Sequence, residues 1–505
     1  MKKIGIIDLG SNSARLVIVN IYSEGYFMVM DELKESVRLG QDMNKDGFLK
    51  PQRVAETIKT LKMFKRLCDS SGVTQIIAVA TAAVRSAKNQ KSFLDEIYST
   101  CGIKLKVQTA EEEATLVYRG VINTMDVPKG IILEIGGGST KIVYYNRRTM
   151  LNYVTLPFGA VTLTDRFADP ALRPEEQATR MEEFFTEELQ KIDWLKDVEP
   201  DVQLIGVGGS FRNLFKIHKM FRKYPIDTVH NYEMSVDDFD SINNMIRVLD
   251  IDKKRKIKGI SPARADILPA AFAVIKSFTD FMHVDRFLLS GAGLREGIMF
   301  SLAMPSTEEK PVTDVLSYSL NTLVHYYDES AAHVEHVVQL SVQLFKQLRV
   351  LHKFPRQYLK VLKIAATLHD CGMRIKYYNH QRHSCYMILN STLYGVTHRE
   401  IVLAAFVACC HKKEDINMLE WAKYKDIVME EDLEIVKRLG IMLRIAESLD
   451  RSMAGVVKSI NCDVLGDSVI MKTEVEGADA SLEIRDAMAA GTEFKRAFKK
   501  NLEIL

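Results

Sequence analysis

Two short segments of this chain follow the same pattern. Residues 4–19 read IGIIDLGSNSARLVIV, and residues 131–145 read IILEIGGGSTKIVYY. In each segment an apolar run meets a carboxylate, breaks at glycine and hydroxyl residues, and then resumes. The corresponding pairs are Asp8 with Glu134, Gly10 with Gly136, Ser13 with Ser139 and Arg15 with Lys141. This predicts an internal duplication, which limits the chain to folds with two related halves.

Each half of the first 304 residues alternates strand and helix patterns. In residues 1–122, apolar strands alternate with amphipathic helices, such as the helix predicted between Pro51 and Gly72. Residues 123–304 repeat this order. Alternating β and α units predict an α/β architecture that binds its ligand between the halves, at the carboxyl ends of the strands.

The pattern changes after a polar linker that carries Pro305 and Pro311. In residues 312–455 the apolar periodicity is helical throughout, which predicts an all-helical domain. Residues 456–505 return to short alternation with a glycine turn, which predicts a small β-containing C-terminal domain.

Composition narrows the class of protein. The 505 residues are 47% apolar and carry a net charge of +2, which is typical of a globular chain of about three or four domains. No stretch approaches the ~18 uncharged apolar residues that a membrane helix requires. The seven cysteines have no regular spacing. We therefore expect a soluble cytoplasmic protein with reduced thiols.

Three glycine turns predict phosphate sites. Two are the repeated breaks, and the third is GVGGSFRNL at residues 206–214, where a glycine turn opens a helix. Glycine leaves backbone N–H groups open to a ligand, hydroxyl residues add donors, and a helix N-terminus favours anions. One such turn is more often a simple connection, but three of them favour a polyphosphate-binding cleft.

Charged residues beside these turns indicate phosphoryl chemistry. Asp8 and Glu134 end equivalent strands, and Mg²⁺ bound to phosphates takes one or two protein carboxylates. In TAEEEATL (109–116) the first glutamate suits the first turn of a helix, and one of the next two is a candidate general base. Arg85 and Arg264 are candidates for neutralising phosphate, although each alone is more often a structural ion pair.

An ordered set of motifs carries a family resemblance: IDLGSNS, ATAAVR, AEEEA, IGGGST, GVGGSFRN, ARAD and GLREG. In this order they resemble the exopolyphosphatase and guanosine pentaphosphate phosphohydrolase family of the actin-like ATPase superfamily. The resemblance implies two duplicated actin-like (RNase H-like) domains, at residues 1–122 and 123–304. It also implies Mg²⁺-dependent removal of a terminal phosphate from inorganic polyphosphate, or from pppGpp to give ppGpp.

The family's pattern implies roles for individual residues. The glutamate before the alanine of the EEA motif, Glu113, would be the base that activates water. One departure is that the family's DIGGGS is EIGGGS here. Glutamate is one methylene longer, so the metal at Asp8 and Glu134 is expected to shift, to bind through water, or to be Mn²⁺. The implied phosphate-binding residues are Ser11, Asn12, Ser13, Arg85, Gly137, Gly138, Ser139, Gly208, Gly209 and Ser210, with Arg264 as a further candidate.

The helical segment resembles the HD metal-hydrolase pattern through AAHVEHVVQL, ATLHDCGMRI, QRHSCYMI, ACCHKKE and LRIAESLDRS. Glu447 stands where that pattern usually has an aspartate, with Asp450 three residues on. The alternatives are a second, phosphodiesterase-like metal site and an inherited scaffold that binds substrate, of which we favour the scaffold. The implied metal set is His333, His369, Asp370, His383, His411 and Glu447.

The same segment is rich in basic residues. Between Lys360 and Glu414, eight lysines and arginines stand against three acids. This suits a path for a long polyanion whose binding weakens with salt, although a solvated helix face is the simpler alternative. The predicted path comprises Arg374, Lys376, Arg382, Lys412 and Lys413.

The sequence therefore favours a processive exopolyphosphatase that acts on polyphosphate, with no membrane or nucleic acid as partner. A pppGpp 5′-phosphohydrolase is the alternative within the class. A sugar or acetate kinase is disfavoured, because the EEEA triplet and the HD-like segment have no place in it. A non-catalytic polyphosphate or alarmone sensor is favoured only by the two Asp-to-Glu departures. The resemblance alone implies a homodimer.

Overall fold

The computed structural model describes residues 1–505 except 44–45, 200, 328, 413–415 and 478. The chain divides into two compact units. Unit 1 comprises residues 1–223 and 229–315, and unit 2 comprises residues 224–228 and 316–505. Each unit is described here by itself.

Unit 1 is built on two mixed sheets. The first contains β1 (Lys2–Leu9), β2 (Ala14–Ile21), β3 (Phe27–Glu35), β4 (Gln75–Ala80) and β5 (Leu105–Val107). The second contains β6 (Lys129–Ile135), β7 (Thr140–Asn146), β8 (Thr149–Leu156), β9 (Gln203–Val207), β10 (Tyr232–Ser235) and β11 (Arg286–Ser290). Their orders are β3-β2-β1-β4-β5 and β10-β11-β9-β6-β7-β8.

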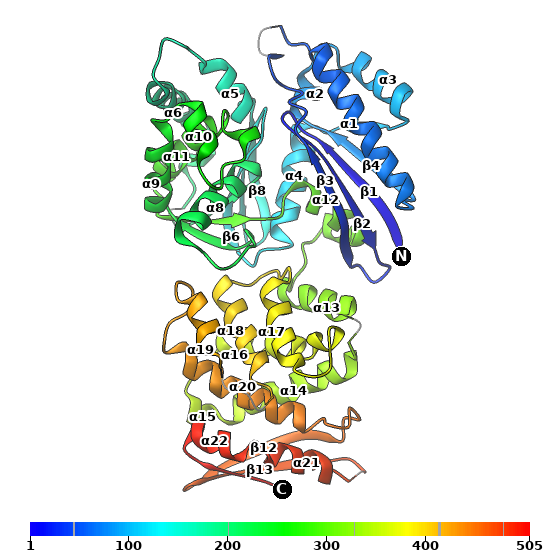
Figure 1. The fold of residues 1–505 in the computed structure, drawn as a ribbon, viewed down its shortest axis with the longest axis vertical. Helices are drawn as coiled ribbons and strands as arrows, with labels where there is room; N and C mark the ends of the chain where they lie inside the picture. Colours follow the sequence, from blue (N-terminus) through cyan, green and yellow to red (C-terminus); the bar gives the residue numbers. More distant parts are fainter. Residues whose placement is uncertain (44–45, 200, 328, 413–415, 478) are drawn as a thin grey trace. The chain divides into compact units, whose positions relative to one another are not determined.

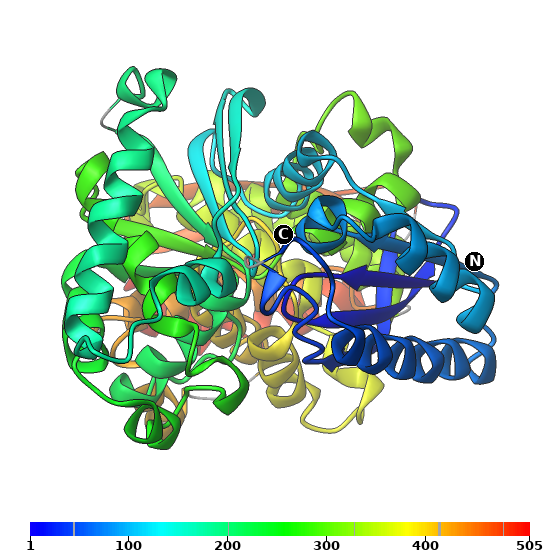
Figure 2. The ribbon, with the colours of Figure 1, turned by 90° about the horizontal axis from the view of Figure 1, so that it is seen from above.

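The two sheets share one topology. β1 pairs antiparallel with β2 and parallel with β4, and β6 pairs in the same way with β7 and β9. Figures 1 and 2 show the N-terminal half, in blue, and the second half, in cyan to green, side by side. The predicted α/β class and the duplication are confirmed.

Helices cover both sheets of unit 1. The N-terminal half has α1 (Pro51–Ser70), α2 (Ala82–Ser86), α3 (Gln90–Cys101) and α4 (Ala110–Ile122). The second half has α5 (Ala160–Phe167), α6 (Pro174–Gln190), α7 (Asp193–Lys196), α8 (Gly209–Arg222), α9 (Val236–Arg247), α10 (Ile251–Lys256), α11 (Leu268–Met282) and α12 (Leu294–Ala303). As predicted, α1 begins at Pro51.

Two glycines let α4 and α12 pack backbone to backbone. A Cβ atom at Gly120 would lie 2.1 Å from the carbonyl oxygen of Gly293, and one at Gly297 would lie 2.0 Å from that of Leu116. No larger residue fits at either position without moving a helix. This contact holds α4, whose first turn carries the three glutamates, against the second half.

The sequence patterns did not predict every strand and helix of unit 1. β3 and β8 were not predicted, because most of their residues are at least partly exposed and lack a clear apolar alternation. The segment DRFLLSGAGLREG contains both a strand and the start of a helix: Arg286–Ser290 is β11, and the helix α12 begins at Leu294. The glycines between them end the strand.

Unit 2 is helical and ends in a small sheet. Its helices are α13 (Val315–Tyr327), α14 (Ala331–Gln347), α15 (Arg349–His352), α16 (Tyr358–Leu368), α17 (His380–Asn390), α18 (His398–Cys409), α19 (Met418–Trp421), α20 (Asp432–Ser448), α21 (Ser481–Met488) and α22 (Gly491–Phe498). β12 (Val457–Leu465), β13 (Ser468–Val475) and β14 (Asn501–Ile504) form the three-stranded sheet. The predicted helical domain and β-containing end are confirmed.

All seven cysteines lie among the described residues, and none of them forms a disulfide. Of the helices in the described part of the chain, none has both the length and the apolar character needed to cross a bilayer.

Candidate active site

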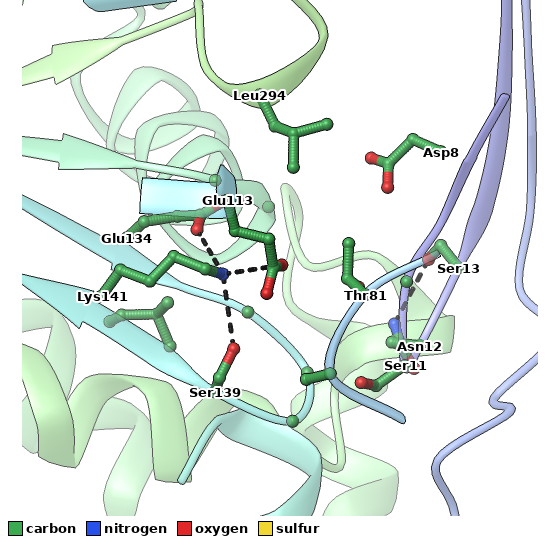
Figure 3. Close-up of a pocket in the computed structure, with 18 of the residues that line it drawn as sticks. Asp8, Ser11, Asn12, Ser13, Thr81, Glu113, Glu134, Ser139, Lys141 and Leu294 are labelled. Carbon is green, nitrogen blue, oxygen red and sulfur yellow. Dashed lines mark hydrogen bonds and ion pairs between the residues drawn. The ribbon is translucent and has the colours of Figure 1, made fainter. Parts of the chain in front are cut away.

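Most of the predicted site residues of unit 1 converge on one pocket of about 120 Å³, whereas Arg85 and Ser210 do not line it. It lies where β1, β6 and β9 end, as expected for ligand sites of α/β sheets. Figure 3 shows the pocket. The predicted residues that line it are Asp8, Ser11, Asn12, Ser13, Glu113, Glu134, Gly137, Gly138, Ser139, Gly208, Gly209 and Arg264.

The first two glycine turns have the same local geometry and face each other. The Gly10 N–H donates to the Ser13 carbonyl at 3.0 Å, and the Gly136 N–H donates to that of Ser139 at 2.9 Å. A Cβ at Gly138 would lie 2.6 Å from the Ser11 Oγ. Only glycine therefore allows the turns to approach this closely.

The polar side chain of Asn12 lies where the first two glycine turns approach each other. Its Nδ2 donates to the Ser13 Oγ at 3.4 Å. Its Oδ1 is buried and has no hydrogen-bond partner among the described residues. An unsatisfied buried acceptor is costly, and a bound ligand that donates a hydrogen bond would remove this cost.

The third turn brings a helix N-terminus and an arginine to the pocket. Gly208 has φ +103°, a conformation that favours glycine, and α8 begins at the next residue. Arg264, nearly buried, donates to the Ser210 Oγ at 3.1 Å. Its guanidinium covers Gly209, where a Cβ would come within 2.7 Å of the Arg264 Nη1. Backbone N–H groups and a cation thus lie together at an anion-binding helix end.

The structure separates the three consecutive glutamates. Thr109 caps α4 and forms a capping box with Glu112, which also pairs with Lys106 at 2.7 Å. Glu111 is exposed, whereas Glu113 is 1% exposed and lines the pocket. Helix periodicity, not composition, therefore selects the residue that faces the phosphate turns.

Arg85 does not line the pocket. Its Nη1 lies 2.5 Å from the Glu113 Oε2 and donates to the Gln108 carbonyl at 2.9 Å. Arg85 was predicted to contact phosphate, but in this structure it orients Glu113.

A lysine that the sequence analysis did not select stands at the centre of the site. The Lys141 Nζ lies 2.8 Å from the Glu134 Oε2 and 3.3 Å from the Glu113 Oε1 (Figure 3). It also donates to the Ser139 Oγ at 3.3 Å. Burial lowers the pKa of Lys141, but the charges of Glu134 and Glu113 outweigh burial and leave that pKa above its ordinary value. Its only signal in the sequence was its match to Arg15 in the repeat.

The two predicted metal ligands differ in their surroundings. Asp8 has no ion pair within 4.0 Å among the described residues, while Glu134 faces Lys141. Burial raises the pKa of Asp8, although Arg295 and Arg15 act in the opposite direction. A carboxylate that is not already paired fits a Mg²⁺ or Mn²⁺ ligand, so Asp8 fits this role. Glu134 does not fit it while the ammonium holds its carboxylate.

Further basic side chains, also missed in the sequence analysis, gather near the pocket. Lys34 is an exposed residue of β3, and desolvation by its surroundings, together with the charges of Arg15, Arg264, Arg212 and Lys216, lowers its pKa to about 8. Burial and the charges of Arg15 and Arg295 lower the pKa of Arg212 to about 10. Cations that depress one another's pKa values are an arrangement suited to a bound polyanion.

Two sequence profiles of one protein family match this chain. The sequence profile of the Ppx/GppA phosphatase family matches residues 17–305, and that of Ppx/GppA phosphatase domain III matches residues 315–482. The chain belongs to the Ppx/GppA phosphatase family.

Individual relatives are distant. A guanosine-5′-triphosphate,3′-diphosphate pyrophosphatase of Pseudoalteromonas atlantica is 25% identical over 403 residues, which are 77% of this chain and 76% of the relative. A crystal structure of an Aquifex aeolicus Ppx/GppA family member is 28% identical, with a TM-score of 0.51 over 60% of this chain and 98% of that one. An exopolyphosphatase structure from Cytophaga hutchinsonii is 27% identical, with a TM-score of 0.56 and the same coverage.

In unit 2, part of the predicted histidine and aspartate set comes together. Two groups have ligand atoms within 4.8 Å of one another: His333, His369 and Asp370, and Asp370, His380 and His411. Asp370 belongs to both. His380 lies 3.0 Å from the Asp370 Oδ1 and was not in the predicted set. The side-chain atoms His369 Nε2 and Asp370 Oδ1 are buried without a hydrogen-bond partner in the described part of the chain.

Two members of the predicted set lie outside these groups. His383 is in neither group, although it is on the same helix as His380, three positions further on. Glu447 pairs with Lys412 at 2.5 Å. The carboxylate that contacts His333 belongs to Asp450 and not to Glu447: the Asp450 Oδ2 lies 2.7 Å from the His333 Nδ1.

The basic path predicted for unit 2 is only partly exposed. Arg374, Lys376 and Arg382 are exposed, and Arg374 donates to the Tyr327 carbonyl. Lys412 is engaged by Glu447. Lys413 lies outside the described residues.

Proposed function

We propose that unit 1 is an exopolyphosphatase that hydrolyses the terminal phosphate of inorganic polyphosphate. The observation that carries the proposal is the convergence of three glycine turns on one pocket that also contains Glu113. Turn N–H groups and hydroxyls provide many donors for phosphate oxygens, and Glu113 is a carboxylate placed beside them.

The proposed reaction is an in-line attack of water on the terminal phosphorus. Glu113, oriented by Arg85, takes a proton from the water as the new P–O bond forms. The bridging P–O bond breaks, and its electron pair leaves with the shortened chain. Ser11, Asn12, Ser139 and the turn N–H groups hold the terminal phosphates, and Arg264 neutralises their charge. Asp8 would hold Mg²⁺ or Mn²⁺, which supplies further positive charge to the phosphate oxygens.

A polymer substrate is favoured by the basic residues that extend beyond the pocket. Arg212 and Lys216 lie close enough to Lys34 for their charges to lower its pKa, and a chain of phosphates bears negative charge along its whole length. Unit 2 has its own exposed basic residues, Arg374, Lys376 and Arg382, and binding of a polyanion to such residues should weaken as salt rises.

A pppGpp 5′-phosphohydrolase is the alternative, favoured by the relative from Pseudoalteromonas atlantica, whose name describes a guanosine pentaphosphate pyrophosphatase. Phosphate release by the full chain, with long polyphosphate or with pppGpp, separates the two. Rapid release from the polymer without intermediate lengths supports the processive exopolyphosphatase. A preference for pppGpp overturns it.

A non-catalytic sensor makes a different prediction. A sensor binds polyphosphate and releases no phosphate, whereas the proposed enzyme loses turnover but not binding in Glu113→Gln. Phosphate release by Glu113→Gln at the wild-type rate would overturn the role of Glu113.

A second candidate function, a metal-dependent phosphodiesterase-like site, is favoured in unit 2 by the two ligand groups that share Asp370. A carboxylate shared by two ions is suited to a pair of metals that clamps a phosphate. Mn²⁺ uptake by the full chain and its Asp370→Asn variant tests this. Equal uptake would leave the scaffold interpretation.

A further inference from the structure

Lys141 occupies a place that three oxygen ligands define. Its side chain is buried and reaches a carboxylate oxygen of Glu134, a carboxylate oxygen of Glu113 and the hydroxyl of Ser139. Three oxygens lie within 3.3 Å of the Lys141 Nζ, as many as an ammonium has N–H donors. The same oxygens are of the type that a hard divalent ion selects.

The charges around Lys141 balance without a metal ion. Glu113 and Glu134 contribute two negative charges, and Lys141 and Arg85 contribute two positive charges at ion-pair distance. A divalent ion between the two glutamates would lie next to the buried ammonium, and the repulsion between the two positive charges would oppose its binding. The ammonium and the ion are therefore mutually exclusive.

We propose that Lys141 is a built-in cation that takes the place of a divalent ion between Glu113 and Glu134. Lys141 is a positioning residue for Glu113. Its occupation of the cation position is independent of the proposed function, whereas its effect on phosphate hydrolysis rests on that function. The departure to glutamate at position 134 belongs to the same arrangement, because the longer side chain reaches the ammonium.

The proposal predicts that a metal site can be created by one substitution. In Lys141→Glu, three carboxylates would surround the position that the ammonium now holds. Affinity for divalent cations rises with the number of charged ligands, so this variant should bind Mn²⁺ where the wild type does not. Lys141→Met, which leaves two carboxylates and no cation, should bind it more weakly than Lys141→Glu.

Mn²⁺ binding is measured by electron paramagnetic resonance on the full chain without substrate. Every protein carries Asp370→Asn, so that ions taken up by the groups around Asp370 in unit 2 do not contribute. Lys141→Glu is expected to bind one more Mn²⁺ than the Asp370→Asn parent, at least about tenfold more tightly than Lys141→Met does. Adding Glu134→Gln should remove this gain, whereas adding Asp8→Asn should leave it. Circular dichroism identifies folded variants, and Lys141→Met replaces Lys141→Glu if the latter does not fold.

Two results would overturn the proposal. One is an Mn²⁺ site in the parent that Glu134→Gln removes, which would mean that Lys141 yields to a metal. The other is a folded Lys141→Glu or Lys141→Met variant that gains no Mn²⁺. Because no substrate is present, these outcomes do not depend on the exopolyphosphatase assignment. If the protein released no phosphate, only the exopolyphosphatase assignment would be contradicted, and the proposal for Lys141 would be unaffected.

Discussion

The two hairpins of unit 1 have the same backbone and different chemistry. In the first, Asp8 faces Arg15 across the strand pair, and in the second Glu134 faces Lys141. Yet Lys141 holds Glu134 at 2.8 Å, whereas the Arg15 Nη1 lies 3.2 Å from a different acid, the Glu32 Oε1.

The third strand of each sheet accounts for this difference. β3 carries Glu32, which pairs with both Arg15 and Arg295. β8, at the same place in the second sheet, has the sequence TMLNYVTL and no acid. Lys141 therefore has no competing partner on that strand and turns into the pocket. The two turns therefore have the same backbone conformation, but the presence of an acid on β3 and its absence on β8 leave Asp8, and not Glu134, available for a metal or a substrate.

The largest expected effect comes from Glu113, whose ion-pair partners in the described part of the chain are Lys141 of the second hairpin and Arg85 of α2. Glu113→Gln keeps the shape of the side chain and removes the base, so phosphate release should fall by about 10²–10⁴-fold. Polyphosphate binding, measured by filter retention, should stay within about threefold of the wild type. Glu112→Gln is the matched control, because Glu112 caps α4 outside the pocket, and it should retain activity.

A comparison of stability tests whether the hairpins differ as described. Lys141→Met leaves two buried carboxylates without this partner and should lower the free energy of unfolding by about 3–5 kcal/mol. Arg15→Met removes a pair whose acid is largely exposed, so it should cost only about 0–1 kcal/mol. Urea unfolding at pH 7 gives both values. Equal losses would contradict the asymmetry between the two hairpins.

Metal dependence offers a third comparison. Asp8→Asn removes the carboxylate that fits Mg²⁺ or Mn²⁺, so the metal concentration for half-maximal phosphate release should rise about tenfold. Glu134→Gln should leave that concentration nearly unchanged, although the turnover number falls because Lys141, which contacts both glutamates, loses its nearer charged partner. The opposite order of effects would assign the metal to the second hairpin.

The repeat made much of the fold predictable, because duplicated strand, turn and glycine patterns are local signals. The role of Glu113 was also predictable, because the residue stands at the start of a predicted helix and in the EEA motif. Lys141, Lys34 and Arg212 were not, because their importance arises from which elements meet across the sheets. In unit 2, spacing along α17 could not decide between His380 and His383, and only the packed structure places His380 beside Asp370.

The smallest expected effect concerns the basic rim near the first hairpin. With a pKa lowered to about 8, Lys34 is charged at pH 7 and loses its proton as the pH rises above 8. A bound polyphosphate is attracted to the charged form, so KM should rise by roughly fivefold between pH 7 and 9, the loss of about 1 kcal/mol of attraction. Lys34→Arg keeps the charge throughout and should flatten this rise. If KM rises equally in Lys34→Arg, the titrating group lies elsewhere, and the basic rim loses its proposed role in binding the polymer.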